Sequence, residues 1–318
     1  MLRICRVLFV GAVAAIASLA LLAAPALAAT PDATTGANGS VTYQSAVLFG
    51  TINPHGASTE VYFQYGTTNK YGLQSTPVEE PAGGKGIAIS IAVSGLAAGT
   101  IYHYRIVASN ATGTALGADK TVLTAKIPLS LAITAAPNPV EFGSPVTIEG
   151  TLSGTGSAGA AVQLQENQYP YTAGFVNVGN AELTLANGSF VFNELGVAVN
   201  TQYRVVSGNI ASIDVPVSVG LSITLHTQAT GTHQRPTVRF SGTIAPAEQS
   251  ARIAFERLVG TSWKVVGGTV AQVAIKNGVV SFAKTLRIFH GGFFRALVLP
   301  VEGAHVSGYS PTAVVRLK

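Results

Sequence analysis

The chain has 318 residues and a formal net charge of +5; 47% of its residues are hydrophobic and only 10% are charged. Its single cysteine, Cys5, and its single methionine, Met1, both lie at the extreme N-terminus. If that end is removed, the protein contains no disulfide, no thiol nucleophile and no thiolate ligand for a metal ion. The composition therefore excludes cysteine-dependent chemistry from the rest of the chain.

The first 28 residues have the pattern of a secretory signal peptide. Arg3 and Arg6 precede an apolar run, Val7–Ala24, and Ala26–Ala28 has the small-x-small pattern of a cleavage site. We expect cleavage to leave Ala29 as the N-terminus and the protein to be secreted or held at the cell surface. The alternative is an uncleaved anchor, since this apolar run is nearly long enough to span a bilayer.

The small, polar stretch 29–40 is expected to be a flexible leader. Beyond it, hydrophobic and small residues alternate with a period of two, most regularly in Ile87–Ser94. Gly, Pro and Asn clusters interrupt these runs every 8–12 residues or so, as in β-sandwiches. No stretch has the 3.6-residue periodicity of an amphipathic helix. The pattern predicts an all-β protein of several sandwiches.

A dense aromatic and charged stretch lies at Tyr102–Arg105. Alternation places Tyr102, Tyr104, Ile106 and Ala108 on the inner face of a strand, with His103 and Arg105 facing solvent. Because Tyr102 follows Leu96, Gly99 and Thr100, it has the position of a tyrosine corner, whose hydroxyl bonds the upstream backbone. We interpret this stretch as scaffold; the alternative is an anion site formed by His103 and Arg105.

Residues 41–124 resemble a fibronectin type III domain of the kind found in bacterial secreted proteins. The stretches that carry the resemblance are Gly50–Pro54, Tyr62–Thr68 with Tyr71-Gly72, and Leu96–Gly113. The resemblance implies a β-sandwich over residues 41–126. It implies little about function, because such domains serve as spacers, adhesion modules and appendages of enzymes.

The remainder of the chain contains an internal repeat with an offset of about 90 residues. Val146–Leu152 matches Val238–Ile244, and Gln202–Val206 matches Phe293–Leu297. Asn187-Gly188 likewise matches Asn277-Gly278. Because the start of the first copy resembles bacterial immunoglobulin-like domains, we expect two such sandwiches, at 127–218 and 219–318. The predicted fold class is therefore three tandem β-sandwich domains after a signal peptide.

Charge is distributed unevenly over these three predicted domains. Residues 29–126 have no net charge, and residues 127–218 carry −5. Residues 219–318 contain eleven Lys and Arg against three Asp and Glu, a net charge of +8. A field of this sign attracts polyanions. The candidate polyanion-binding residues are Arg235, Arg239, Arg252, Arg257, Lys264, Lys276, Lys284, Arg287 and Arg295.

Motifs for catalysis or cofactor binding are weak or missing. Gly154–Gly159 is a literal G-x-G-x-x-G, but a strand is expected after it, whereas dinucleotide binding requires a helix. The six histidines have no metal-ligand spacing, and Glu79-Glu80 is the only adjacent acidic pair. We expect no catalytic residue, no cofactor and no metal ion.

Aromatic residues in the predicted loops are a second group of candidates. Tyr71, Tyr169 and Tyr171 are placed to stack on sugar rings, although packing beneath their loops is the alternative.

The sequence thus favours a secreted, non-enzymatic structural, adhesion or spacer protein. The first alternative is a binding module for an anionic or carbohydrate polymer of the cell surface. The second is an accessory part of a glycan-active enzyme system. Possible partners are such a polymer or another protein, and no nucleic acid is expected.

Overall fold

The computed structural model describes residues 28–194, 196–272 and 275–317, and all regular secondary structure in them is β-strand. This confirms the predicted all-β class. Contacts divide the chain into two compact units that meet between Ala125 and Lys126. The predicted signal peptide lies, except for Ala28, outside the described residues. In the part of the chain that is described, no helix is long and apolar enough to cross a membrane.

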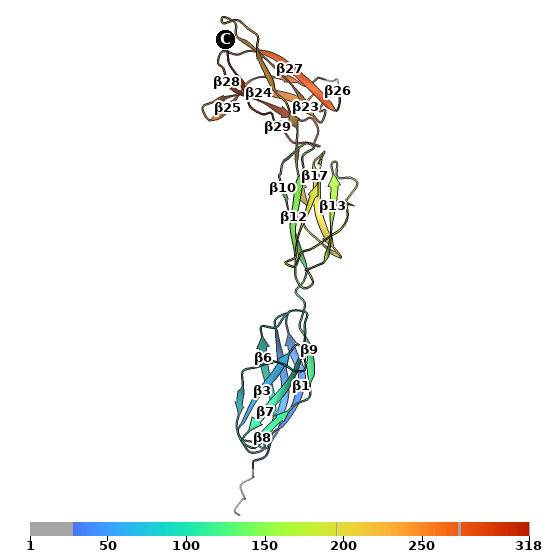
Figure 1. Ribbon diagram of the computed structural model, residues 1–318, viewed down its shortest axis with the longest axis vertical. Helices are drawn as coiled ribbons and strands as arrows, with labels where there is room; N and C mark the ends of the chain where they lie inside the picture. The colour runs from blue at the N-terminus through green and yellow to red at the C-terminus, as the bar shows by residue number, and fades with distance from the viewer. Residues whose placement is uncertain (1–27, 195, 273–274, 318) are drawn as a thin grey trace, which may run out of the picture. The chain divides into compact units, whose positions relative to one another are not determined.

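The first unit is a sandwich of two antiparallel sheets (Figure 1). One sheet has the order β1-β2-β6, with β1 at Asp32–Val41, β2 at Ser45–Asn53 and β6 at Ile87–Ser94. The central strands of the other are β3 (Thr59–Gly66) and β7 (Ile101–Asn110). Four short strands complete it: β4 (Leu73–Gln74), β5 (Val78–Glu80), β8 (Gly113–Leu116) and β9 (Lys120–Leu123).

Alternation along β7 positions the core of this unit as the sequence predicts. Tyr102, Tyr104, Ile106 and Ala108 are all buried and belong to one hydrophobic cluster. The hydroxyl of Tyr102 accepts a hydrogen bond of 3.0 Å from the backbone N–H of Ala97. The tyrosine corner is therefore confirmed, and it fixes the turn between the two sheets.

Replacing Tyr102 with phenylalanine should lower the free energy of unfolding of the first unit by about 1–3 kcal/mol, because the N–H of Ala97 loses its acceptor. Denaturant unfolding combined with hydrogen exchange at Ala97 measures both effects. Tyr62→Phe, at a half-exposed tyrosine in β3, is the matched control and should change little. Equal losses in the two variants would contradict this role of the corner.

The prediction that residues 29–40 form a flexible leader is wrong, because β1 occupies most of this segment. Thr35 is buried, and its hydroxyl accepts a hydrogen bond from the N–H of Ile106 (3.2 Å). The hydroxyl of Tyr104 donates to the carbonyl of Gly36 (3.1 Å). A Cβ at Gly36 would lie 2.8 Å from the carbonyl oxygen of Phe49. The small residues that suggested disorder thus permit close approach of a strand.

The second unit begins with another pair of antiparallel sheets. The first has the order β10-β12-β16; its strands are β10 (Ser130–Ala136), β12 (Val146–Ser153) and β16 (Ser189–Glu194). The facing sheet is centred on β13 (Ala161–Gln168) and β17 (Thr201–Ser207). Its short strands are β14 (Val176–Asn177), β15 (Glu182–Leu183), β18 (Ile210–Ala211) and β19 (Val215–Val217).

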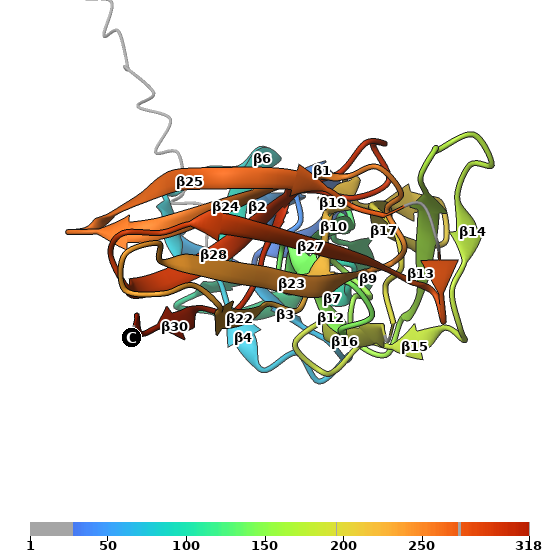
Figure 2. The same ribbon diagram turned by 90° about the horizontal axis from the view of Figure 1, so that it is seen from above.

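The remainder of this unit repeats the plan around a separate core. The sheet β21-β23-β27-β26 contains β21 (Ser222–Ile223), β22 (His226–Ala229), β23 (Thr237–Ala245), β26 (Ile275–Lys276) and β27 (Val279–Arg287). The sheet β25-β24-β28-β29 contains β24 (Arg252–Val259), β25 (Ser262–Val270), β28 (Gly292–Leu299), β29 (Gly308–Tyr309) and β30 (Ala313–Val315). Two further strands, β11 (Val140–Glu141) and β20 (Val219–Gly220), pair in parallel. Figure 2 shows β23 and β27 side by side.

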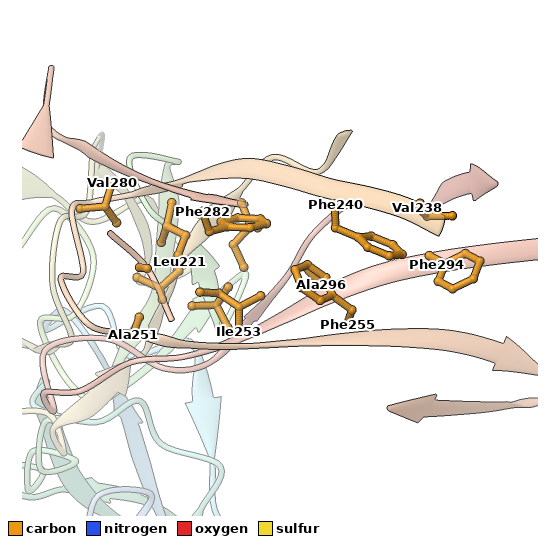
Figure 3. Close-up of a cluster of buried hydrophobic side chains, with 14 of the residues drawn as sticks. Leu221, Val238, Phe240, Ala251, Ile253, Phe255, Val280, Phe282, Phe294 and Ala296 are labelled. Atoms are coloured by element: carbon orange, nitrogen blue, oxygen red, sulfur yellow. The ribbon is translucent and has the colours of Figure 1, made fainter. Parts of the chain in front are cut away.

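Phenylalanines dominate the last of these cores. The rings of Phe240 and Phe255 stack with centroids 4.7 Å apart, and Phe294 lies 5.5 Å from Phe240 (Figure 3). All three side chains are buried between β23 on one side and β24 and β28 on the other. This cluster is separate from the hydrophobic cluster of residues 133–219. The division of the second unit into domains at 218/219 stays a prediction.

The internal repeat predicted from the sequence has matching positions in the two sheet pairs. Val146–Leu152 lies in β12, which pairs with β16, and Val238–Ile244 lies in β23, which pairs with β27. The Asn-Gly pairs precede β16 and β27, and Gly188 and Gly278 have φ of 81° and 74°. The two segments therefore adopt one topology, as their sequences indicate.

Candidate functional site

The nine candidate cationic residues lie on both sheets of the C-terminal sandwich rather than on one face. Four belong to the sheet of β24, β25 and β28: Arg252, Arg257, Lys264 and Arg295. Arg235 precedes β23, and four belong to the sheet of β23, β26 and β27: Arg239, Lys276, Lys284 and Arg287. The structure thus divides the predicted set into two groups.

Three of these arginines lie close together on one sheet. In the register of β23 and β27, Thr237 lies opposite Arg287. Arg239 is two residues after Thr237 on β23, so it points to the same face as Arg287. Arg235 lies in a turn just before β23, and the carbonyl of the adjacent Pro236 accepts a hydrogen bond from Ile288 next to Arg287 (3.1 Å), so Arg235 belongs to the same end of the sheet. All three side chains are exposed, and no ion pair joins any of them to an acid of the described chain. We call Arg235, Arg239 and Arg287 the basic cluster.

The acids of this sandwich do not neutralise the basic cluster. Among the described residues there, Glu256 pairs with Arg295 at 2.7 Å and Glu248 pairs with His305 at 2.8 Å. The third acid, Glu302, is exposed. Two of the three carboxylates are therefore already engaged, and most of the positive charge stays uncompensated.

Arg257 and Arg295 have side chains held by hydrogen bonds within the fold, whereas Arg287 has a looser contact, 5.9 Å from the ring centre of Phe289. Arg257 Nε donates to the carbonyl of Gly291 (3.0 Å). The guanidinium of Arg295 lies 4.3 Å from the ring centre of Trp263 and 3.9 Å from that of Tyr309. Cation–π contacts on both sides and the ion pair to Glu256 fix this side chain. The charge of Arg295 is therefore compensated by Glu256 and covered by two rings, so it contributes little to the attraction of a polymer.

The arrangement around Arg295 recurs in the other two sandwiches. In each, an arginine on one central strand donates through Nε to a side-chain oxygen of the residue directly opposite on the neighbouring strand. The three pairs are Arg105 with Gln64 (2.9 Å), Arg204 with Gln165 (2.8 Å) and Arg295 with Glu256 (2.7 Å). Each guanidinium also covers an aromatic ring: Tyr71 for Arg105, Phe175 for Arg204, and Trp263 and Tyr309 for Arg295.

Sequence reasoning missed this motif, which we call the arginine pair. A usable signal was present, because the arginine follows a buried aromatic residue each time: Tyr104, Tyr203 and Phe294. The sequence contains no comparable signal for the acceptors Gln64, Gln165 and Glu256, because only strand register identifies them. A motif repeated in three sandwiches with rings of three different kinds, Tyr, Phe and Trp, points to a role in building the sheet.

The sugar-stacking candidate Tyr71 is held in a polar network rather than presented freely. Its hydroxyl donates to Asp119 Oδ1 (2.9 Å), and His103 Nδ1 lies 2.8 Å from Asp119 Oδ2. The guanidinium of Arg105 lies 4.7 Å from the ring centre of Tyr71. His103 and Arg105 therefore face outward as predicted, but they have partners. A shallow pocket of about 320 Å³ adjoins Tyr71, Gln64 and Lys70.

The other two tyrosines belong to the second unit. The rings of Tyr169 and Tyr171 meet edge to face with centroids 5.8 Å apart. Tyr169 also lies against Gly303, where an added Cβ would be 3.2 Å from its ring. Tyr171 is 38% exposed. Tyr169 is thus packed against the chain, whereas Tyr171 is exposed. Neither unit contains all three candidate tyrosines, so no site shared by the three is formed within a unit.

Hydrogen bonding lowers the pKa of Asp119. Burial opposes this change, but the hydrogen bonds from His103 and Tyr71, with the charges of His103 and Arg105, outweigh it. Burial and the hydrogen bond to Asp119 raise the pKa of Tyr71. As pH falls, the unfolded chain binds the proton of Asp119 first, so the network stabilises the fold above about pH 4 and loses this effect below it.

Asp119→Asn should therefore reduce the free energy of unfolding of the first unit at neutral pH. The loss should be at most about 1 kcal/mol, since solvent screens a side chain that is 38% exposed. The difference between the two proteins should shrink as pH falls below about 4. Urea unfolding across this pH range measures it. A difference that grows toward acid would have the wrong sign.

Features that suggest catalysis are not assembled in the described residues. The glycines of Gly154–Gly159 form the loop between β12 and β13, and a strand follows them as predicted. A groove of about 480 Å³ on the β10-β12-β16 sheet contains one carboxylate, Glu149. Within the described ranges, no three His, Cys, Asp or Glu side chains are grouped to hold a metal ion.

Comparison with known proteins adds no family. No protein-family model matches the chain, and no curated protein matches it. Among solved structures, it is similar to a tetra-tandem repeat in the extending region of a large adhesion protein, with 15% identity, a TM-score of 0.37 and coverage of 90% of this chain and 74% of that one. It is also similar to the FN1–FN3 domains of chicken CNTN1, with 12% identity, a TM-score of 0.28 and coverage of 90% and 98%. The sheet topology itself defines the class, a chain of fibronectin III- or immunoglobulin-like β-sandwiches.

Proposed function

We propose that this chain is a secreted, non-enzymatic structural and adhesion protein of the bacterial cell surface. The observation that carries the proposal is the arginine pair. In all three sandwiches, an arginine bonds to a Gln or Glu side chain on the neighbouring strand and covers an aromatic ring, so these charged and aromatic groups are engaged with each other within the fold. Such contacts stiffen a sandwich and supply no nucleophile or general base. The predicted signal peptide and the bacterial resemblance support the location.

We also propose that residues 219–318 bind an anionic polymer, because one specific observation favours this function. The three cations of the basic cluster are exposed at one end of a sheet and have no acidic partner among the described residues. Uncompensated charges of one sign raise the local concentration of a polyanion. The carbohydrate alternative has less support, since Tyr71 is held by Asp119 and Arg105 and Tyr169 packs against Gly303.

Replacing Arg235, Arg239 and Arg287 together with glutamine tests this binding. A basic side chain near an anionic surface contributes about 1 kcal/mol, so the triple variant should bind an immobilised polyanion roughly a hundredfold more weakly at about 0.1 M salt. Binding is measured with the full secreted chain on polyglutamate and on a polyphosphate.

The matched control replaces Lys70, Lys85 and Lys120 with glutamine. These lysines are also exposed, and they lie in the first unit, which has no net charge. They should change binding by less than about threefold, because removing them takes away the same charge without touching the basic cluster. Equal losses in the two triple variants would show that binding follows net charge alone, and the basic cluster would not be the site.

A further inference from the structure

Strand β6 forms an open edge of the first unit. It is the outer strand of the sheet β1-β2-β6, and β2 is its only strand partner among the described residues. All eight of its residues, Ile87 to Ser94, pair with β2 in a register without a bulge. No other backbone hydrogen bond of the described chain reaches it. Alternate N–H and C=O groups along its far side are therefore free to pair with another strand.

Three other edge strands, β1, β25 and β10, carry features that block such pairing. In β1 the register shifts twice, around Asn38, and Tyr104 and Ile106 bond to it from the opposing sheet. The edge strand β25 carries Lys264 and has a bulge at Val266, which has no partner in β24. β10 has no charge but contacts β17, β18 and β19. Natural sheets protect their edges with charges, bulges and covering elements of this kind. Strand β6 has no charge, no proline and no bulge.

We propose that β6 is a site of β-strand addition at which a second copy of this chain pairs antiparallel with the first. The pattern of the strand complements itself. Ile89, Ile91 and Val93 point into the core, whereas Ala88, Ser90, Ala92 and Ser94 point outward and are exposed. Two such strands about a twofold axis place inward residues beside inward residues and small outward residues beside small outward residues.

Charge favours a second copy over a partner of opposite charge. Residues 29–126 contain five basic and five acidic residues, so two copies of this unit do not repel each other. None of the eight residues of β6 is charged, so the strand offers no opposite charge to a charged partner. Because β1, the other edge of this sheet, is protected, the twofold pairing uses β6 of each copy and closes as a dimer.

The symmetry restricts the register. Facing residues must point to the same side, so the twofold axis passes through a residue, and the registers that pair most of β6 place it at residue 90 or residue 91. In the first case Ser90 faces Ser90 and in the second Ser90 faces Ala92. Lysines at both positions therefore face lysines in either register, and like charges across a strand pair oppose association.

The experiment uses the full chain without its signal peptide, followed by analytical ultracentrifugation up to about 1 mM. The wild type should dimerise. The double variant Ser90→Lys/Ala92→Lys and the double variant Ser90→Glu/Ala92→Glu should each dimerise about tenfold or more weakly. An equimolar mixture of the two should recover dimers. Amide hydrogen exchange should show alternate residues of β6 becoming protected on association.

The matched control is Thr121→Lys/Leu123→Lys on β9, where both side chains are also exposed. It should dimerise like the wild type, and circular dichroism checks that all variants keep their strands. A wild type that stays monomeric throughout, a dimer insensitive to both β6 variants, or a mixture that fails to recover would each overturn the proposal. This outcome is independent of polyanion binding, which lies on the other unit.

Discussion

Replacing Phe294 with alanine is expected to lower the free energy of unfolding of the C-terminal sandwich by about 3–5 kcal/mol. Phe294 is fully buried, and its ring packs against Phe240 in the cluster shown in Figure 3. The neighbouring rings belong to strands of both sheets. The cavity left by the missing ring therefore cannot close unless one sheet shifts against the other. The chain has one tryptophan, Trp263, in this sandwich, and its fluorescence during urea unfolding reports the change.

The adjacent residue provides the matched control. Phe293 precedes Phe294 on β28, but its side chain is 51% exposed on the opposite face. Phe293→Ala should therefore change the free energy of unfolding by less than about 1 kcal/mol. Similar losses for the two variants would mean that the alternation of β28 is not the one described.

Replacing Glu256 with alanine is the second change with a large expected effect. Its side chain is 11% exposed, and it is the only acidic partner of Arg295 among the described residues. Removing one member of a buried ion pair leaves the other charge without compensation, which costs about 3 kcal/mol. Unfolding followed by the fluorescence of Trp263, which also contacts Arg295, measures the loss.

Two further variants separate the ion pair from general damage. Glu302→Ala removes an exposed carboxylate of the same sandwich and should cost less than about 0.5 kcal/mol. Glu256→Leu/Arg295→Met removes both charges at similar volume and should recover most of the stability lost in Glu256→Ala. A double variant as unstable as the single one would contradict the account of an uncompensated charge.

Local alternation was enough to predict much of the fold. The period of two identified which side chains of β7 are buried, and the spacing of Leu96, Gly99 and Tyr102 identified the tyrosine corner. These features depend on residues close together in the chain, where pattern and geometry are directly linked. The repeat between Val146–Leu152 and Val238–Ile244 identified equivalent strands for the same reason.

Features that depend on strand register could not be predicted. Small polar residues indicated a flexible leader, but β1 pairs with β2 because Tyr104 and Ile106, about 70 residues away, bond to it. The arginine pairs join residues 39 to 41 positions apart. The sequence indicated that the candidate cations do not share one face, but only strand register separates the basic cluster from Arg295, which pairs with Glu256.

The measurement that tests the proposed function most directly is retention of the full chain on an immobilised anionic polymer as salt rises from about 0.1 to 1 M. Over this range the Debye length falls from about 10 Å to about 3 Å, so exposed charges lose most of their attraction. The account predicts steep loss of the bound protein with salt, and no retention on a neutral polymer of the same length. Retention that is absent at low salt, unchanged by salt, or equal on the neutral polymer would contradict it.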